Sequence, residues 1–144
     1  MDVAITLLDE TLELPCYAHG GDAGLDLRAA VDGVLGPFER MTVPCGFALA
    51  IPEGHAGLVI PRSGLAARHG VSIVNAPGLV DAGYRGEIKV VLINLDPHEA
   101  FSFSRGDRIA QLMIVAVPPI TLHNTDALPE SDRGDRGFGS SGVC

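Results

Sequence analysis

The sequence lacks features that mark several large classes of protein. No apolar run is long enough to span a bilayer, and the first ten residues lack the basic region and cleavage site of a signal peptide. The three cysteines are widely spaced without a Cys-x-x-Cys pair, and the five histidines are scattered, which argues against a disulfide framework and a zinc site. We therefore expect a cytoplasmic protein with no membrane partner.

Basic charge is also scarce. Ten Lys and Arg stand against eighteen Asp and Glu, for a net charge of −8, which argues against a broad nucleic-acid surface. An anionic ligand would bind only where a few arginines converge. The phosphate-binding pattern Gly-x-x-x-x-Gly-Lys-Ser/Thr is absent, so a P-loop nucleotidase is rejected.

What is present is one domain's worth of short β segments. Eighteen glycines and ten prolines divide the 144 residues. Strands are expected at 3–8, 41–51, 57–60, 88–93, 100–103 and 109–117. Their mixture of alternating and continuously apolar patterns favours a closed or double-layered antiparallel fold. The one expected helix is Ser63–His69, with Ser63 as its N-cap.

The composition changes at Thr121, where polar residues begin to dominate. We expect a core over 1–120 and a C-terminal arm over 121–144 that is mobile unless it docks.

The richest stretch is 74–94. It opens with turn-forming residues, reaches a carboxylate at Asp81 and a glycine-flanked ring at Tyr84, and is apolar over 88–93. The apolar run predicts a buried strand, and the residues before it predict a hairpin whose glycines let backbone approach another group. Alone, this stretch favours a turn carboxylate and a packing ring.

Two earlier patches combine charge with glycine. In 22–28, Asp26 alternates with two leucines, either as an outward-facing strand carboxylate or as one that holds a hard cation directly or through water. In 61–65, a guanidinium, a hydroxyl and free N–H groups at a helix start suit an anion. An ordinary helix cap beside a surface arginine is the equal alternative there.

Two later patches complete the set. In 105–112, Gln111 interrupts an apolar strand, so its amide needs partners from the protein or a ligand. In 133–142, a ring and hydroxyls in a glycine-rich segment suggest a lid over a planar, anionic ligand. A disordered terminus is the simpler alternative.

In this order, the five patches resemble the five motifs of the trimeric deoxyuridine triphosphatases (dUTPases) from about Gly21 to Gly142, most specifically over 75–86 and 137–142. The resemblance implies an all-β, distorted jelly-roll (β-clip type) with one short helix, assembling as a homotrimer with shared active sites. It also implies hydrolysis of dUTP to dUMP and pyrophosphate with Mg²⁺. That activity limits uracil incorporation into DNA and supplies dUMP for dTMP synthesis.

Carried over residue by residue, the resemblance gives two carboxylates distinct roles. Asp81 looks like the general base for the water that attacks the α-phosphorus. Asp26 looks like the carboxylate that holds magnesium through its water shell. The residues that resemble the phosphate-binding motif and its neighbour are Arg62, Ser63, Gly64 and Gln111.

The resemblance also implies the nucleoside contacts. Asn75 and the backbone around Gly78 would pair with the uracil edge, and cytosine would leave those polar groups unpaired. Tyr84 looks like the ring against deoxyribose, where a 2′-hydroxyl would clash. The residues that resemble the closing lid, contributed by a neighbouring subunit, are Arg133, Phe138, which stacks on uracil, Gly139, Ser140 and Ser141.

Some residues fit the resemblance less directly. The family usually has a glycine where Arg136 stands, so Arg136 either adds a phosphate contact or points to solvent. Glu87 and Lys89 are expected to form an ion pair without a catalytic role. Among rivals, a dCTP deaminase would need a catalytic glutamate where Val91 stands. A silent nucleotide-binding member would not need the two carboxylates, and a purely structural jelly-roll leaves the aromatic tail unexplained.

Overall fold

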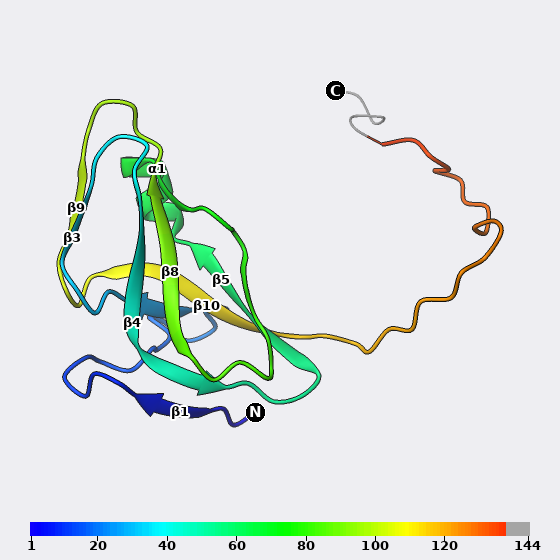
Figure 1. Cartoon of the computed structure of the whole chain (residues 1–144), viewed down its shortest axis with the longest axis horizontal. Coiled ribbons are helices and arrows are strands. Elements are labelled where there is room, and N and C mark those ends of the chain that lie inside the picture. Colours follow the sequence, from blue (N-terminus) through cyan, green and yellow to red (C-terminus); the bar gives the residue numbers. More distant parts are fainter. Residues whose placement is uncertain (138–144) are drawn as a thin grey trace.

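Two long antiparallel strands, β4 and β8, run side by side through a computed structural model of the chain, which describes residues 1–137 (Figure 1). Their sheet has the order β1 (Ala4–Leu7), β4 (Arg40–Ala50), β8 (Glu87–Asn94) and β6 (Val71–Ile73). The second sheet has the order β2 (Leu25–Arg28), β10 (Arg108–Ala116), β5 (His55–Pro61) and β7 (Gly78–Val80). A two-stranded ribbon joins β3 (Gly33–Leu35) and β9 (Phe101–Phe103). All these pairings are antiparallel, so the double-layered alternative expected from the sequence is confirmed.

The core is built from alternate positions of the central strands. In β8, Ile88, Val90 and Leu92 are buried while the residues between them are more exposed, which is the period of two that places one face of a strand inward. From the other sheet, Leu27 and Leu112 are fully buried. Burying one such leucine contributes about 1.5–3 kcal/mol, so these side chains hold the two sheets together.

Gly46 allows β4 to bend over the N-terminal segment. The register between β4 and β8 shifts between Pro44 and Ala48, and Gly46 has a φ of 74°. A Cβ there would lie 2.9 Å from the side chain of Leu12, and the Gly46 carbonyl accepts the backbone N–H groups of Leu8 and Asp9. Only glycine combines this left-handed conformation with this close approach.

An ion pair ties this N-terminal segment to the turn before β10. Arg105 Nη2 lies 2.7 Å from Asp9 Oδ2 and also bonds the hydroxyl of Thr11. The hydrogen bonds from Arg105 and Thr11 lower the pKa of Asp9 from 3.8 to about 2. Asp9 is therefore ionised throughout the neutral range.

The single helix, α1 (Ser63–His69), lies where the sequence predicts it, but its expected cap is wrong. Arg62 occupies the N-cap position with extended backbone and without a side-chain capping bond, and Ser63 is the first helical residue. At the other end, Gly70 has a φ of 63° and its N–H donates to the carbonyl of Ala66. This left-handed glycine ends the helix before β6.

The six expected strands are confirmed within one or two residues, whereas β3, β6 and β7 are not predicted by the sequence. The hairpin predicted over the residues before β8 is wrong, because β8 pairs with β6 instead, with Ile73 opposite Leu92. The segment between β6 and β8 crosses to the second sheet, where it pairs with β5 as β7.

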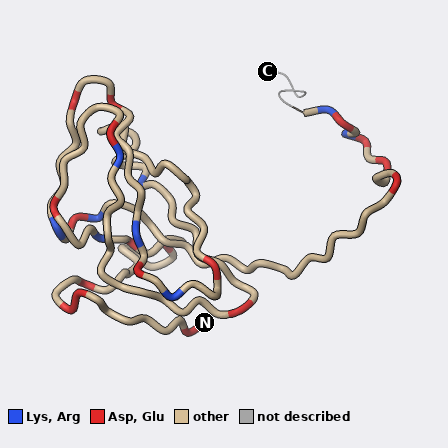
Figure 2. Tube along the Cα trace, viewed as in Figure 1, with Lys and Arg blue, Asp and Glu red and all other residues tan. Residues whose placement is uncertain are grey.

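The described part of the C-terminal segment, residues 117–137, contains no strand or helix and extends away from the two sheets (Figure 1). Its residues are exposed, and both acidic and basic positions lie along it (Figure 2). Across residues 1–137, no helix has the length and apolar character needed to cross a membrane.

Candidate active site

Asp26 lies on β2, at the edge of the second sheet, and is only 5% exposed. Its backbone N–H donates to the Cys16 carbonyl at 2.9 Å, so the segment before β2 lies against this edge. The outward-facing alternative for this carboxylate is therefore wrong. A nearly buried carboxylate requires charged or hydrogen-bonding partners.

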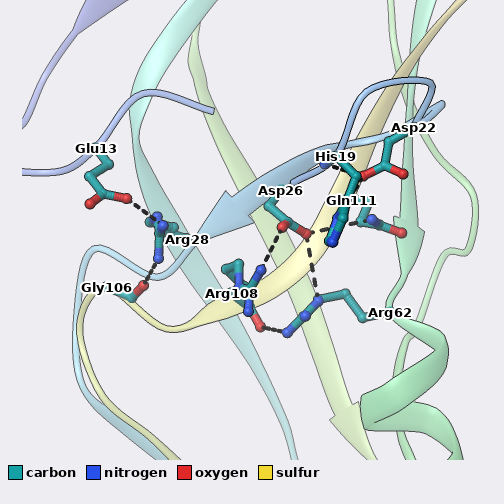
Figure 3. A network of polar contacts seen from close by, with 9 residues as sticks. All are labelled: Glu13, His19, Asp22, Asp26, Arg28, Arg62, Gly106, Arg108 and Gln111. Carbon is teal, nitrogen blue, oxygen red and sulfur yellow. Dashed lines mark hydrogen bonds and ion pairs between the residues drawn. The ribbon is translucent and has the colours of Figure 1, made fainter. Parts of the chain in front are cut away.

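Those partners are two arginines and an amide (Figure 3). Arg108 Nη1 donates to Asp26 Oδ2 at 3.2 Å, and Arg62 Nε lies 3.7 Å from Oδ1. Gln111 Nε2 lies 3.5 Å from the same Oδ1. Two guanidinium groups against one carboxylate leave this cluster with a charge of +1, which suits a phosphate-bearing ligand.

Backbone geometry gives the cluster its shape. Arg62 follows directly after β5, and its Nη1 donates to the Arg108 carbonyl at 2.7 Å, which fixes one guanidinium to the backbone of the neighbouring strand. Ser63 and Gly64 come next and are exposed. Their backbone N–H groups belong to the first turn of a helix, where no intrahelical acceptor is available. Three of the predicted phosphate-binding residues thus stand together beside the cluster.

Asp81 lies in a different environment. It is exposed, and within residues 1–137 it has no ion-pair partner. Its carbonyl accepts the N–H of Tyr84 at 3.0 Å, which closes a turn after β7. Asp81 lines a hollow of about 190 Å³ with Tyr84, Glu87 and Lys89. It also lines a hollow of about 430 Å³ with His55 and the 117–119 segment.

Tyr84 is held over Gly86. Its hydroxyl donates to the Glu87 carbonyl at 3.1 Å, and a Cβ at Gly86 would lie 2.4 Å from Tyr84 Oη. Arg85 Nη1 donates to the carbonyls of Ala82 and Tyr84 at 2.6 and 2.7 Å, which braces the same turn. The sequence predicts that a glycine of this segment lets the backbone approach another group closely. This is found at Gly86, whose backbone lies against the ring of Tyr84.

The other glycines of this segment differ from one another. At Gly78 a Cβ would lie 3.3 Å from Asn75 Nδ2, so the two predicted uracil-binding residues are neighbours. At Gly83 no atom of the described residues lies within 4 Å of a Cβ. Glu87 and Lys89 form the expected ion pair, with Nζ 3.8 Å from Oε2.

The chain therefore gathers the predicted residues into two separate groups. One group surrounds Asp26 and the other surrounds Asp81, and no hydrogen bond or ion pair of residues 1–137 joins them. Arg133 belongs to neither group. Its Nε donates to the Arg136 carbonyl within the C-terminal segment. Four predicted lid residues lie outside the described residues, namely Phe138, Gly139, Ser140 and Ser141.

Arg108 is the residue of this cluster that sequence reasoning missed. It stands within the 105–112 stretch, where the sequence pattern indicates only Gln111 as a site residue. The sequence does show a basic residue, Arg108, three positions before Gln111, the polar residue in an otherwise apolar strand. In a regular strand this spacing places the two side chains on opposite faces, so the sequence predicts that Arg108 and Gln111 do not share a site.

A magnesium site, if formed here, must use few protein ligands. Within residues 1–137, no group of three or more His, Cys, Asp or Glu side chains could hold a metal ion. Asp26 offers a single carboxylate beside phosphate-binding groups. That donor set fits magnesium, which keeps several waters and is commonly held by one or two carboxylates together with substrate phosphates.

Comparisons with known protein families, sequences and structures all find the same family, and each covers most of the chain. The family model described as dUTPase matches residues 10–142. The deoxyuridine 5′-triphosphate nucleotidohydrolase of Streptomyces griseus is 54% identical over 142 residues, covering 99% of this chain and 81% of that protein. The Thermobifida fusca protein of the same name is 58% identical over 140 residues, covering 97% and 78%. The solved structure of Staphylococcus bacteriophage 80alpha dUTPase with dUPNHPP has a TM-score of 0.90 at 30% identity and 99% coverage of both chains.

Proposed function

Because this chain belongs to the dUTPase family and hydrolyses dUTP to dUMP, we propose that its two site carboxylates divide the chemistry, with Asp81 as the general base and Asp26 as the magnesium-holding group. One observation carries this division. Asp26 is nearly buried between two arginines, whereas Asp81 is exposed without an ion-pair partner in residues 1–137. Two carboxylates in such different surroundings are suited to different roles.

In this mechanism Asp81 takes a proton from water as the water oxygen bonds to the α-phosphorus. The bond from that phosphorus to the α,β-bridging oxygen breaks, and the electron pair leaves with pyrophosphate. Arg62, with Ser63, Gly64 and Gln111, binds the phosphate oxygens. Positioning and charge neutralisation supply most of the rate in such reactions.

Magnesium would be held by Asp26 through water and by the phosphates themselves. When bound, the ion neutralises phosphate charge and orients the triphosphate chain. The cluster's own charge of +1 supports the same ligand, because it lies in a chain whose net charge is −8.

Selection of dUTP is assigned to the segment around Asp81. Asn75 and the backbone at Gly78 bind the uracil edge, and Tyr84 packs against deoxyribose. The neighbouring positions of Asn75 and Gly78, and the support that Glu87 gives to Tyr84, favour these roles. The arm over 121–144 then closes over the nucleotide with Arg133 and Phe138, Gly139, Ser140 and Ser141.

We assign the assembly as a homotrimer in which each site combines residues from several chains, and the location as the cytoplasm. The separation of the Asp26 and Asp81 groups within one chain supports shared sites. Mixing two inactive variants, Asp26→Asn and Asp81→Asn, tests this directly. If the two carboxylates of a site come from different chains, random re-association of equal amounts restores about one quarter of wild-type activity, since each position is intact half of the time. No recovery would place both carboxylates in one chain.

Pyrophosphate release tests the function itself. With magnesium, dUTP should be hydrolysed far faster than dCTP, dTTP or UTP, and a chelator should stop the reaction. Asp81→Asn should keep affinity for dUTP and lose about 100- to 10,000-fold in turnover, because the water loses its base. Asp2→Asn is a matched control that removes an exposed carboxylate at the N-terminus. Near-normal turnover of Asp81→Asn would remove Asp81 from the mechanism, and ammonia release from dCTP would favour the deaminase alternative.

A further inference from the structure

A β-bulge at Ile109 brings Arg108 to Asp26. The register of β10 against β2 pairs Arg108 with Arg28 and then Ala110 with Leu27, so Ile109 is one extra residue on β10. Consistent with this, Ile109 and Ala110 are consecutive residues and both are buried. Bulges of this kind re-aim side chains and are common beside active sites.

The extra residue changes which side chains share a face. In a regular strand, residues three apart point to opposite faces of the sheet. With one residue inserted between them, Arg108 and Gln111 point to the same face, where Gln111 lies opposite Asp26. The bulge also leaves the Arg108 carbonyl to accept the guanidinium of Arg62 at 2.7 Å.

The two arginines hold Asp26 in unequal ways. Arg108 makes a hydrogen bond of 3.2 Å to Oδ2, whereas Arg62 Nε lies 3.7 Å from Oδ1, beyond hydrogen-bonding distance. Arg62 can therefore turn its Nε from Asp26 towards a phosphate without breaking a hydrogen bond to Asp26, while its Nη1 keeps the bond to the Arg108 carbonyl. Arg108 has no such freedom.

We propose that Arg108 is a positioning residue for the magnesium step: it holds Asp26 in place while Arg62 transfers from Asp26 to the substrate phosphates. This inference rests on the proposed function. It deepens that function by assigning the two arginines opposite behaviour during substrate binding.

Loss of Arg108 has a defined consequence. Asp26 is nearly buried and would keep only Arg62 as a cationic partner in the cluster (Figure 3). Arg62 would then be drawn onto Asp26, because an unpaired buried charge is costly. Both the phosphate contact and the orientation of the magnesium-holding carboxylate would suffer. Removing a group that orients a metal ligand costs about 10- to 100-fold in metal affinity.

Binding of a non-hydrolysable dUTP analogue, α,β-imido-dUTP, measured by calorimetry tests the proposal without requiring turnover. Arg108→Gln should weaken binding about 10-fold in magnesium and much less in chelator, and the magnesium concentration for half-maximal binding should rise. Arg108→Lys should recover most of the loss, because it restores a charged donor. Arg28→Gln is the matched control: Arg28 lies opposite Arg108 in the strand pair, but its guanidinium contacts Glu13 and the Gly106 carbonyl.

A double-mutant comparison separates positioning from direct binding. If Arg108 acts through Asp26, Arg108→Gln should have little further effect on magnesium-dependent binding in an Asp26→Asn background. An equal loss with magnesium and chelator that persists in that background would make Arg108 a direct phosphate ligand and overturn the proposal. So would an equal loss in Arg28→Gln, which would show a general effect of charge.

The proposal and the proposed function fail in distinguishable ways. Wild-type protein that does not hydrolyse dUTP contradicts the function. If wild type hydrolyses dUTP but Arg108→Gln leaves both the magnesium dependence of binding and the thermal midpoint unchanged, only the positioning role of Arg108 is contradicted.

Discussion

Replacing Gly86 by alanine tests whether this glycine makes room for the ring of Tyr84. A Cβ at Gly86 lies 2.4 Å from Tyr84 Oη and 2.6 Å from Cζ, whereas ordinary contact begins at 3.4 Å. The ring must therefore move outward by roughly 1 Å, as in other overpacked sites. Its hydrogen bond to the Glu87 carbonyl, 3.1 Å long, is then lost.

Three contributions set the expected change in stability. Loss of the hydrogen bond costs about 1 kcal/mol, and displacement of the packed ring costs about 1 kcal/mol more. The added methyl group offsets about 0.4–1 kcal/mol, because the φ of Gly86 is outside the left-handed region and alanine restricts the unfolded chain. Gly86→Ala should therefore lower the free energy of unfolding by about 1 kcal/mol.

The same substitution in a Tyr84→Ala background should have the opposite sign. Without the ring there is nothing to displace, so Gly86→Ala should stabilise the protein by about 0.4–1 kcal/mol. Urea titrations followed by circular dichroism on the four proteins should give a coupling free energy of about 2 kcal/mol, because only the hydrogen bond and the ring packing depend on Tyr84. Equal effects in both backgrounds would show that alanine acts on the backbone and would refute the ring argument.

Nucleotide selectivity provides a second measure of the same change. If Tyr84 guards the 2′ position, Gly86→Ala should reduce the ratio of kcat/KM for dUTP over UTP by about 10-fold, since misplacing a positioning group by 1 Å is costly. Tyr84→Phe is the matched control, because it keeps the ring and removes only the hydroxyl. Unchanged selectivity in Gly86→Ala, together with measurable coupling, would separate the packing of this ring from sugar recognition.

Further predictions concern the core, the acid range and the thiols. Leu92→Ala should lower the free energy of unfolding, measured in urea, by about 2–5 kcal/mol. Leu122 is 87% exposed, so Leu122→Ala should lower it by less than about 0.5 kcal/mol. Similar losses in the two variants would contradict the core assignment. The pKa of Asp9 is lowered from 3.8 to about 2 by its arginine and threonine partners, so its contribution to stability is complete above pH 4 and is lost as the pH falls towards 2. Thermal midpoints of wild type and Asp9→Asn should differ above pH 4 and converge near pH 2, and a constant difference would refute this assignment. Iodoacetamide at neutral pH should label exposed Cys16 and spare Cys45. Burial, and to a smaller extent the nearby Glu87, raises the pKa of the Cys45 thiol to about 12. Equal labelling of the two cysteines, measured by peptide mass spectrometry, would show that the core opens.

The long strands were predictable because their own residues carry the signal. β8 is apolar at five of the six positions over 88–93, and β10 is apolar over most of nine residues. β3, β6 and β7 have three residues each, too few to show a period of two. They are strands because longer partners align them, which is a tertiary effect that the local sequence does not contain.

The burial of Asp26 was not predictable for a related reason. Its alternation with Leu25 and Leu27 is compatible with an exposed face, and this is the commoner outcome for a strand carboxylate. The Cys16 carbonyl that bonds its backbone comes from ten residues earlier, in a segment without periodic signal. Arg108 comes from β10, and Arg62 comes from the N-cap of α1, directly after β5. The environment of this carboxylate is therefore set by which segments meet, not by its neighbours in sequence.

Arg108 shows how much of the site depends on register. Read as a regular strand, 108–116 places Arg108 and Gln111 on opposite faces, and no glycine marks the position of the bulge. Only the pairing with β2 shows that Ile109 is an extra residue. That single insertion adds a second cation to Asp26 and changes the charge of the Asp26–Arg62 pair from zero to +1. In a chain with a net charge of −8, the local preference for an anion thus arises from strand register, and composition alone gives no sign of it.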